Sequence, residues 1–207
     1  MRFNYLCSSA GVFLGLAFYS AGVQAEIITG SVTGVSSGDT FTLLEGPLKK
    51  HVVRLAEVAA PDLKQDFGHN AQQWLTAAIL SRNVIVDVVS SERRSNKVTI
   101  LIGRVYLPQP KISNQAVPCK NGDCGKIYVN AGLIKAGCGW VTKVVDAPDL
   151  AMISLENEAR KSKVGLWGTI NPEPPWVYRK EHKIAGSYSS PEEGPQKRSA
   201  PGPIRLY

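Results

Sequence analysis

Hydrophobic and polar residues alternate with a period of two over residues 26–55, and glycines interrupt the alternation. A period of two is typical of strands that bury one face. The pattern predicts three antiparallel strands, over about residues 27–35, 41–44 and 52–55, which are joined by turns. The folded part of the chain is therefore expected to begin with a strand meander.

A helical period begins at Gly68. One face of the predicted helix is apolar, with residues at positions i, i+3, i+4, i+7 and i+8: Ala71, Trp74, Leu75, Ala78 and Ile79. The β-branched stretches 84–89 and 98–106 then predict two more strands, which brings the number to five. A helix packed on a small sheet follows from this order.

The C-terminal half predicts short elements. Residues 127–129 favour a short strand, and Asn130 is expected to cap a helix over residues 131–136. Asp149 is expected to cap a further helix that ends near Gly165. Five strands followed by short helices predict an α+β fold, a five-stranded barrel with about three helices.

Residues 1–25 have the pattern of a removable signal peptide. Arg2 gives a positive start, residues 12–18 are apolar, and Val23-Gln24-Ala25 forms a small-residue cleavage site. No later segment reaches the roughly 20 apolar residues that a spanning helix needs. We therefore expect a periplasmic or secreted protein without stable membrane insertion.

Residues 26–180 are long enough for one domain with an adequate core. A proline-rich stretch with two cysteines, at about residues 108–125, interrupts the pattern and is expected to be a loop insertion. Residues 181–207 consist largely of Ser, Pro, Gly and charged residues, a composition typical of a disordered tail.

Three cysteines remain after the predicted cleavage: Cys119, Cys124 and Cys138. Cys119 and Cys124 are the favoured disulfide pair, because Asn121-Gly122 turns the chain back between them. Cys138 is then left over. A site with three thiolates around a metal is the weaker alternative, since no histidine lies nearby and the spacing matches no common zinc pattern.

The chain carries a formal net charge of +7, and loss of Arg2 with the leader leaves +6. Lysine and arginine side chains that neutralise phosphates gain from counterion release, so the charge fits a nucleic-acid partner. It fits an ordinary basic protein equally well. Charge alone therefore does not decide the function.

Two stretches carry the most specific signal: Ser37-Gly38-Asp39-Thr40, and Arg54-Leu55 followed by Pro61-Asp62. With a glycine that opens a helix, they resemble the pattern of the staphylococcal nuclease (thermonuclease) family. Glu158-Ala159-Arg160 with Gly165-Leu166-Trp167 resembles the closing signature of that family. Pro175-Trp176 with Arg179 resembles an extension of exported bacterial members. The similarity covers about residues 30–179.

The resemblance implies an oligonucleotide/oligosaccharide-binding-type barrel that hydrolyses DNA and RNA phosphodiesters with one Ca²⁺. In this family two aspartates hold the hard cation through oxygen ligands. Two arginines stabilise the charge that develops on the phosphate, and a glutamate helps to activate the attacking water.

The family roles carry over to this chain only in part. The resemblance places Asp39 at the first metal-ligand position and Arg54 at the first phosphate-arginine position. Asp62 takes the position of the base, one methylene shorter than the glutamate of the family. The second metal aspartate falls on Ala59, which has no oxygen to offer, and the second arginine falls on Ile100.

Each retained residue also has a structural alternative. Asp39 can order a turn, and Arg54 can be an ordinary barrel-surface arginine that pairs with Glu57. A loop guanidinium, from Arg93 or Arg94, would have to replace the second arginine.

Two functional hypotheses remain open from the sequence. One is an exported protein that acts on nucleic acid, at best as a weak Ca²⁺-dependent phosphodiester endonuclease. The other is a catalytically inactive module that binds nucleic acid or an envelope protein partner. The two losses favour binding over catalysis, because the cation and the two arginines act together on one phosphate.

Overall fold

The computed structural model describes residues 26–93, 98–108, 126–142 and 149–182. The strands in these ranges are β1 (Glu26–Val35), β2 (Thr40–Glu45), β3 (Lys49–Leu55), β4 (Val58–Ala59), β5 (Asn83–Arg93), β6 (Thr99–Pro108), β7 (Lys126–Tyr128) and β8 (Trp140–Val141). Six of them form one sheet in the order β3-β2-β1-β5-β6-β7, and β3 also pairs in parallel with β6. This additional pairing closes β1, β2, β3, β5 and β6 into a mixed barrel. The α+β barrel prediction is confirmed.

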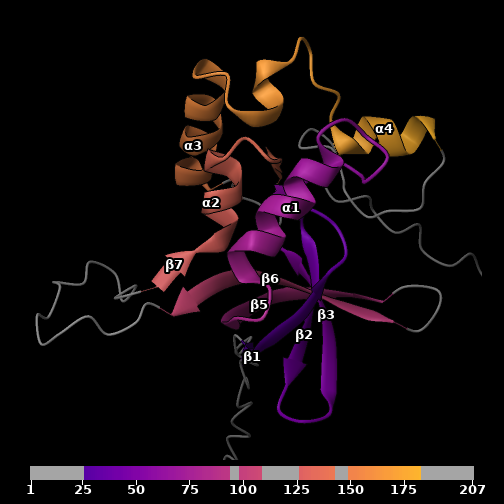
Figure 1. The fold of residues 1–207 in the computed structure, drawn as a ribbon, viewed down its shortest axis with the longest axis vertical. Helices are drawn as coiled ribbons and strands as arrows, with labels where there is room; N and C mark the ends of the chain where they lie inside the picture. Colours follow the sequence, from indigo (N-terminus) through magenta and orange to yellow (C-terminus); the bar gives the residue numbers. More distant parts are fainter. Residues whose placement is uncertain (1–25, 94–97, 109–125, 143–148, 183–207) are drawn as a thin grey trace, which may run out of the picture.

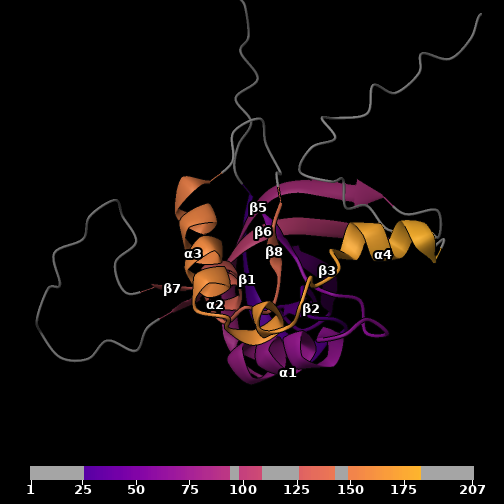
Figure 2. The same ribbon diagram turned by 90° about the horizontal axis from the view of Figure 1, so that it is seen from above.

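The helices in the same part of the chain are α1 (Gly68–Ile79), α2 (Val129–Lys135), α3 (Leu150–Lys161) and α4 (Pro175–Glu181), with a 3-10 turn η1 (Gly165–Gly168). Helices α1, α2 and α3 lie on the side of the barrel away from the β2–β3 hairpin, and α4 lies at the edge of this layer (Figures 1 and 2). The sequence predicts about three helices and does not predict α4. The proline at the first position of α4 sets a helical φ there, which suits a helix start.

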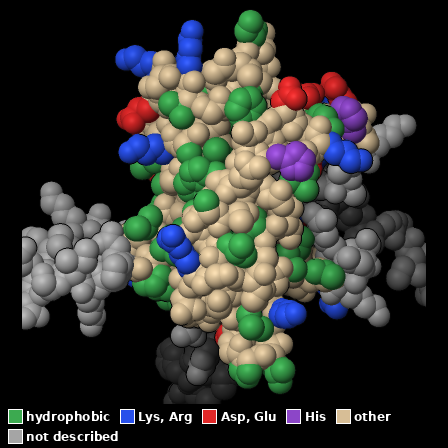
Figure 3. All heavy atoms as spheres, viewed as in Figure 1, with side chains coloured by type: hydrophobic (Ala, Val, Ile, Leu, Met, Phe, Trp, Pro, Cys, Tyr) green, Lys and Arg blue, Asp and Glu red, His purple; other side chains and the backbone are tan. Residues whose placement is uncertain are grey.

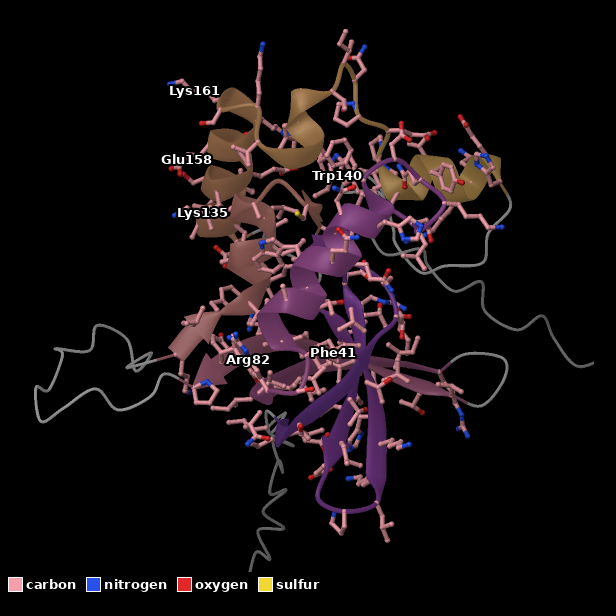
Figure 4. All side chains as sticks on the ribbon, in the orientation of Figure 1. Phe41, Arg82, Lys135, Trp140, Glu158 and Lys161 are labelled. Atoms are coloured by element: carbon pink, nitrogen blue, oxygen red, sulfur yellow. The ribbon has the colours of Figure 1, made fainter. Side chains whose placement is uncertain are left out.

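The apolar faces of the strands and of helix α1 form one hydrophobic core. Strand residues at alternate positions fill the barrel interior, and the apolar stripe of α1 covers its end. The largest fully buried side chains include Phe41, Leu43, Leu55, Leu75 and Ile79. Phe41 lies among the barrel strands in Figure 4.

Two glycines let three chain segments approach closely beside the barrel. A Cβ atom at Gly38 would lie 2.5 Å from the Cβ of Ala71 and 2.7 Å from that of Ala60. A Cβ atom at Gly68 would overlap the carbonyl oxygen of Asp62. The turn before β2, the loop after β4 and the start of α1 therefore pack directly on one another.

Asn130 does not cap α2, contrary to the sequence prediction. It lies inside the helix, and Tyr128 occupies the cap position. The fully buried amide of Asn130 accepts from the backbone N of Val105 at 3.0 Å and donates to the backbone O of Ala56 at 2.8 Å. These bonds satisfy two buried backbone groups, which explains why the asparagine is inside the helix and not at its end.

The predicted cap at Asp149 is confirmed. Its Oδ1 accepts from the backbone N of Ala151 at 2.8 Å and of Met152 at 3.3 Å. The helix that it begins ends at Lys161, earlier than the predicted end near Gly165. The next residues form a separate turn, η1, whose first residue has a φ of 58°.

A second hydrophobic cluster holds the C-terminal segment against the domain. Its buried members are Trp140, Ala159, Leu166 and Trp167, and Phe67 and Trp176 pack against them. Burial of these aromatic side chains therefore fixes the position of the C-terminal segment.

Several sequence predictions fall on residues 1–25, 94–97, 109–125, 143–148 and 183–207, which lie outside the described residues. They concern the signal peptide, Cys119 and Cys124 in the loop insertion, and the tail. Cys138 is buried and free, and burial raises the pKa of its thiol to about 11. No helix in the described ranges is long and apolar enough to cross a membrane.

Candidate active site

Asp39 joins the turn before β2 to two neighbouring segments. Its side chain is 3% exposed, and Oδ1 accepts from the hydroxyls of Ser37 at 2.9 Å and Thr40 at 2.8 Å. Oδ2 accepts from the backbone N of Ala60 at 3.0 Å, and the Asp39 carbonyl accepts from the backbone N of Leu55 at 2.8 Å. The carboxylate therefore orders this turn with both of its oxygens.

Arg54 lies on the outer face of the barrel, since its neighbours Val53 and Leu55 belong to the core. It is nevertheless only 4% exposed, and its Nη1 lies 3.3 Å from Oε2 of Glu92. The alternative of an ordinary surface arginine beside Glu57 does not match this environment, because Glu57 pairs with Arg104.

Glu57 has a different partner because the chain turns after β3. Its own φ is 63°, and its buried carboxylate accepts from Nη2 of Arg104 at 2.7 Å and from the Tyr128 hydroxyl at 3.3 Å. Hydrogen bonding to Glu57 raises the pKa of Arg104, and burial together with the Glu57 charge raises the pKa of Tyr128. These groups tie β6 and β7 to the turn after β3.

Ile100 occupies the position of the second arginine. It lies directly opposite Glu92 in the β5–β6 ladder and is 5% exposed. Arg93 is exposed at the end of β5, and as the next residue after Glu92 it points to the opposite face of the strand. Arg94 lies outside the described residues. The described part of β5 therefore provides no guanidinium to replace the missing one.

Ala59 occupies the position of the second metal ligand. It is fully buried and pairs with Trp140 in the small β4–β8 sheet, so only a methyl group stands there. Ca²⁺ takes six to eight oxygen ligands, whereas both oxygens of Asp39 already accept hydrogen bonds. Among the described residues, no group of three or more His, Cys, Asp or Glu side chains could hold a metal ion. The residues present do not fit the Ca²⁺ site of the family.

Asp62 is bound to the C-terminal helix. Its Oδ2 accepts from Nε of Arg179 at 2.6 Å, and its backbone N donates to Oε1 of Gln65 at 3.2 Å. Gln65 also donates to the backbone carbonyl of Glu173, just before α4. The carboxylate at the position of the base therefore serves as an anchor for α4.

The structure brings the three predicted site residues into one region. Asp39 contacts the backbone at Leu55 and at Ala60. Leu55 follows Arg54 directly, and Ala60 lies two positions before Asp62 in the chain, so the three residues lie in one region. Sequence reasoning missed the partners Glu92 and Arg179. The motif around Pro175-Trp176 gave a signal for Arg179, and nothing in the sequence gave one for Glu92. With these partners the region contains three carboxylates and two guanidiniums, and each guanidinium is already paired. The arrangement favours structural ion pairs over an open phosphate site.

Comparison with known proteins decides the family. Residues 52–169, more than half of the chain, match the family model described as staphylococcal nuclease homologue. The chain belongs to this family. The match lies within the region of resemblance that the sequence motifs define, and it agrees with the barrel fold. Nucleic acid is the substrate class of this family.

Several curated relatives are similar over most of their length. The chain is 30% identical to Protein ParB of Escherichia coli over 183 residues, which cover 87% of this chain and 94% of that protein. It is 29% identical to an uncharacterized endonuclease of Escherichia coli O157:H7, with 80% and 94% covered. It is also 29% identical to a micrococcal nuclease of Shigella flexneri, with 75% and 83% covered.

Proposed function

We propose that this family member acts on nucleic acid mainly by binding it, and that it hydrolyses phosphodiester bonds slowly at most. The observation that carries the proposal is Ala59, a buried methyl group at the position of an acidic metal ligand. The loss of one charge-stabilising group from a transition state typically costs about 10²–10³ in rate. Ile100 removes a second such group, so the two losses together argue against efficient hydrolysis.

The ion pairs of the region support the same proposal. A phosphate that approaches Arg54 has to compete with the Glu92 carboxylate, whose side chain is 26% exposed. Asp62 would have to leave Arg179 before it could activate a water. Both ion pairs therefore oppose catalysis. They do not oppose binding of a polyanion by other Lys and Arg side chains.

Electrostatic attraction supports binding of modest strength. The predicted mature chain has a net charge of +6, but Lys and Arg side chains are scattered over the face shown in Figure 3 and do not gather in one patch. Scattered cations give weak binding that depends strongly on salt. Ca²⁺, the cofactor implied by the family, would have Asp39 as its one carboxylate ligand from the family set.

The proposal is tested by incubating the chain with single- and double-stranded DNA and RNA in Ca²⁺, in other divalent ions and in chelator, together with a salt titration of binding. We expect binding that weakens as salt rises, with no metal-dependent cleavage beyond a slow background. Rapid metal-dependent cleavage that Asp39→Ala abolishes would reverse the proposal. Absence of binding to every strand would reject nucleic acid as the ligand.

We also propose that the protein is exported and acts in the periplasm or outside the cell. The proposal is supported by the positive start, apolar centre and small-residue cleavage site of residues 1–25. Mass measurement of the protein recovered from periplasmic and culture fractions tests it. We expect a chain that begins at Glu26, whereas an unprocessed chain confined to the cytoplasm would contradict the proposal.

A further inference from the structure

An open pocket of about 850 Å³ lies between α3, β8 and the segment that leads into α4. Its size falls in the range of small-molecule sites, about 300–1,000 Å³. The apolar part of its lining is formed mainly by Trp140, Trp167, Trp176, Ile153, Pro172 and Pro174, and we name it the tryptophan pocket. In Figure 4 Trp140 lies between the α3–η1 region and α4.

Planar groups surround the tryptophan pocket. The ring of Trp140 meets Trp167 edge-on with centroids 5.4 Å apart and Trp176 with centroids 6.3 Å apart. The guanidinium carbon of Arg160 lies 3.7 Å from the ring centre of Trp167, and Glu156 holds this guanidinium at 2.9 Å. Indole rings and guanidinium planes are the groups on which unstacked nucleobases stack.

Besides Arg160, four polar residues line the pocket: Thr142, Glu156, Asn171 and Glu173. A side-chain amide and a carboxylate can bind the donors and acceptors on the edge of a base, as Asn does with adenine and Glu with cytosine. A purely apolar ligand would make no use of these groups. The combination of flat walls and a few polar groups therefore favours a flat, polar aromatic ligand.

Backbone contacts link a wall of the tryptophan pocket to the candidate active site. Trp140 pairs with Ala59, and the next residue, Ala60, donates to Oδ2 of Asp39. On the other wall, Trp176 and Arg179 stand three positions apart on α4, which places them on neighbouring parts of one helix face. The pocket and the region of the former catalytic residues are therefore built on the same two elements, β4–β8 and α4.

We propose that the tryptophan pocket binds one unstacked base of a single-stranded nucleic acid. This proposal rests on the proposed function and narrows its substrate class to single strands. The bases of a duplex are paired and stacked, so they enter a pocket only after the duplex opens at a free-energy cost. The partly exposed Trp176 ring and the Arg160 plane contact the base, while cations outside the pocket attract the phosphates.

The full chain is tested with two labelled single strands of equal length and charge. One strand is entirely abasic, and the other is abasic except for one base. We expect the strand with one base to bind at least about tenfold more tightly. Trp176→Ala should reduce this ratio to about one, and Trp176→Phe should retain most of it. Leu48→Ala, at an exposed position 89% accessible to solvent, is the control that leaves the ratio unchanged.

The outcomes separate this inference from the proposed function. Equal, salt-sensitive binding of both strands to the unmodified protein would overturn the base site and leave nucleic-acid binding in place. Binding of neither strand would overturn both. If a proline-rich peptide quenched the tryptophan fluorescence and the strand with one base did not, the pocket would belong to a protein partner and the inference would be wrong.

Discussion

Nε of Arg179 lies 2.6 Å from Oδ2 of Asp62, although 117 residues separate them in the chain. The pair joins α4 to the loop after β4, at the position where the family has its base. A residue expected to activate water is thus used to hold a helix. Arg54 is likewise at a position that carries a catalytic role in the family, and it forms an ion pair with Glu92.

The contribution of the Arg179–Asp62 pair to stability is measurable by a double-mutant cycle. Arg179→Ala and Asp62→Asn are each expected to lower the free energy of unfolding by about 1–3 kcal/mol, because each leaves a partly buried charge without its partner. The coupling energy between the two changes should be about 0.5–3 kcal/mol in denaturant titrations. Lys180→Ala, at an exposed position of the same helix, is the control. Additive effects would show that the two side chains do not interact in solution.

Removal of the Glu92 charge is expected to strengthen nucleic-acid binding. Glu92→Gln keeps the shape of the side chain but removes the carboxylate that opposes a phosphate near Arg54. We expect affinity for an oligonucleotide to rise about threefold to tenfold at low salt, and the gain to shrink as salt is added. Glu158→Gln removes an equal charge from an exposed position of α3 and should have little effect. An equal gain in both variants would mean that only net charge matters.

Asn130 is expected to be important for stability. Asn130→Ala would leave the buried backbone N of Val105 and the buried backbone O of Ala56 without their partners. The expected loss is about 2–4 kcal/mol in the free energy of unfolding. Thermal unfolding compared with Asn157→Ala, an exposed position on α3, checks this. Similar small losses in the two variants would show that water replaces the amide.

The three cysteines after the leader are expected to react differently with an alkylating reagent. Burial raises the pKa of the Cys138 thiol to about 11, so little thiolate is present near pH 7 and labelling of the native protein should be slow. Cys138 should react after unfolding without reductant, and Cys119 and Cys124 only after reduction. Peptide mass analysis assigns the labels. Labelling of Cys119 in the unfolded, unreduced chain would contradict the predicted disulfide.

Local patterns predicted the five barrel strands, α1 and the cap at Asp149, because these depend on periodicity and on neighbours in the chain. They did not predict the two-residue strands β4 and β8, which pair with each other. The partner of Arg54 could not be predicted in this way. The β5–β6 register shifts between Val88 and Ser90, and a shift of one residue moves every later side chain to the other face. Nothing in the sequence around Glu92 indicates where this irregularity lies.

The position of Arg179 also depends on tertiary packing. Helix α4 is seated by contact of Trp176 with Trp140 and by the bond from Gln65 to the Glu173 carbonyl. The motif resemblance identified Pro175-Trp176 and Arg179 as a unit but gave no partner for the arginine. Asn130 shows the opposite case, a residue with a strong local preference for helix caps that is used for buried backbone groups instead.

The central claim is that the residues at the family's metal position no longer hold Ca²⁺. Calorimetric titration of Ca²⁺ into the protein tests this most directly, with Asp39→Ala as the comparison. We predict no saturable binding below about millimolar Ca²⁺, since Ala59 supplies no oxygen and the Asp39 carboxylate is already hydrogen-bonded. One Ca²⁺ bound at micromolar concentration, and lost in Asp39→Ala, would contradict the claim.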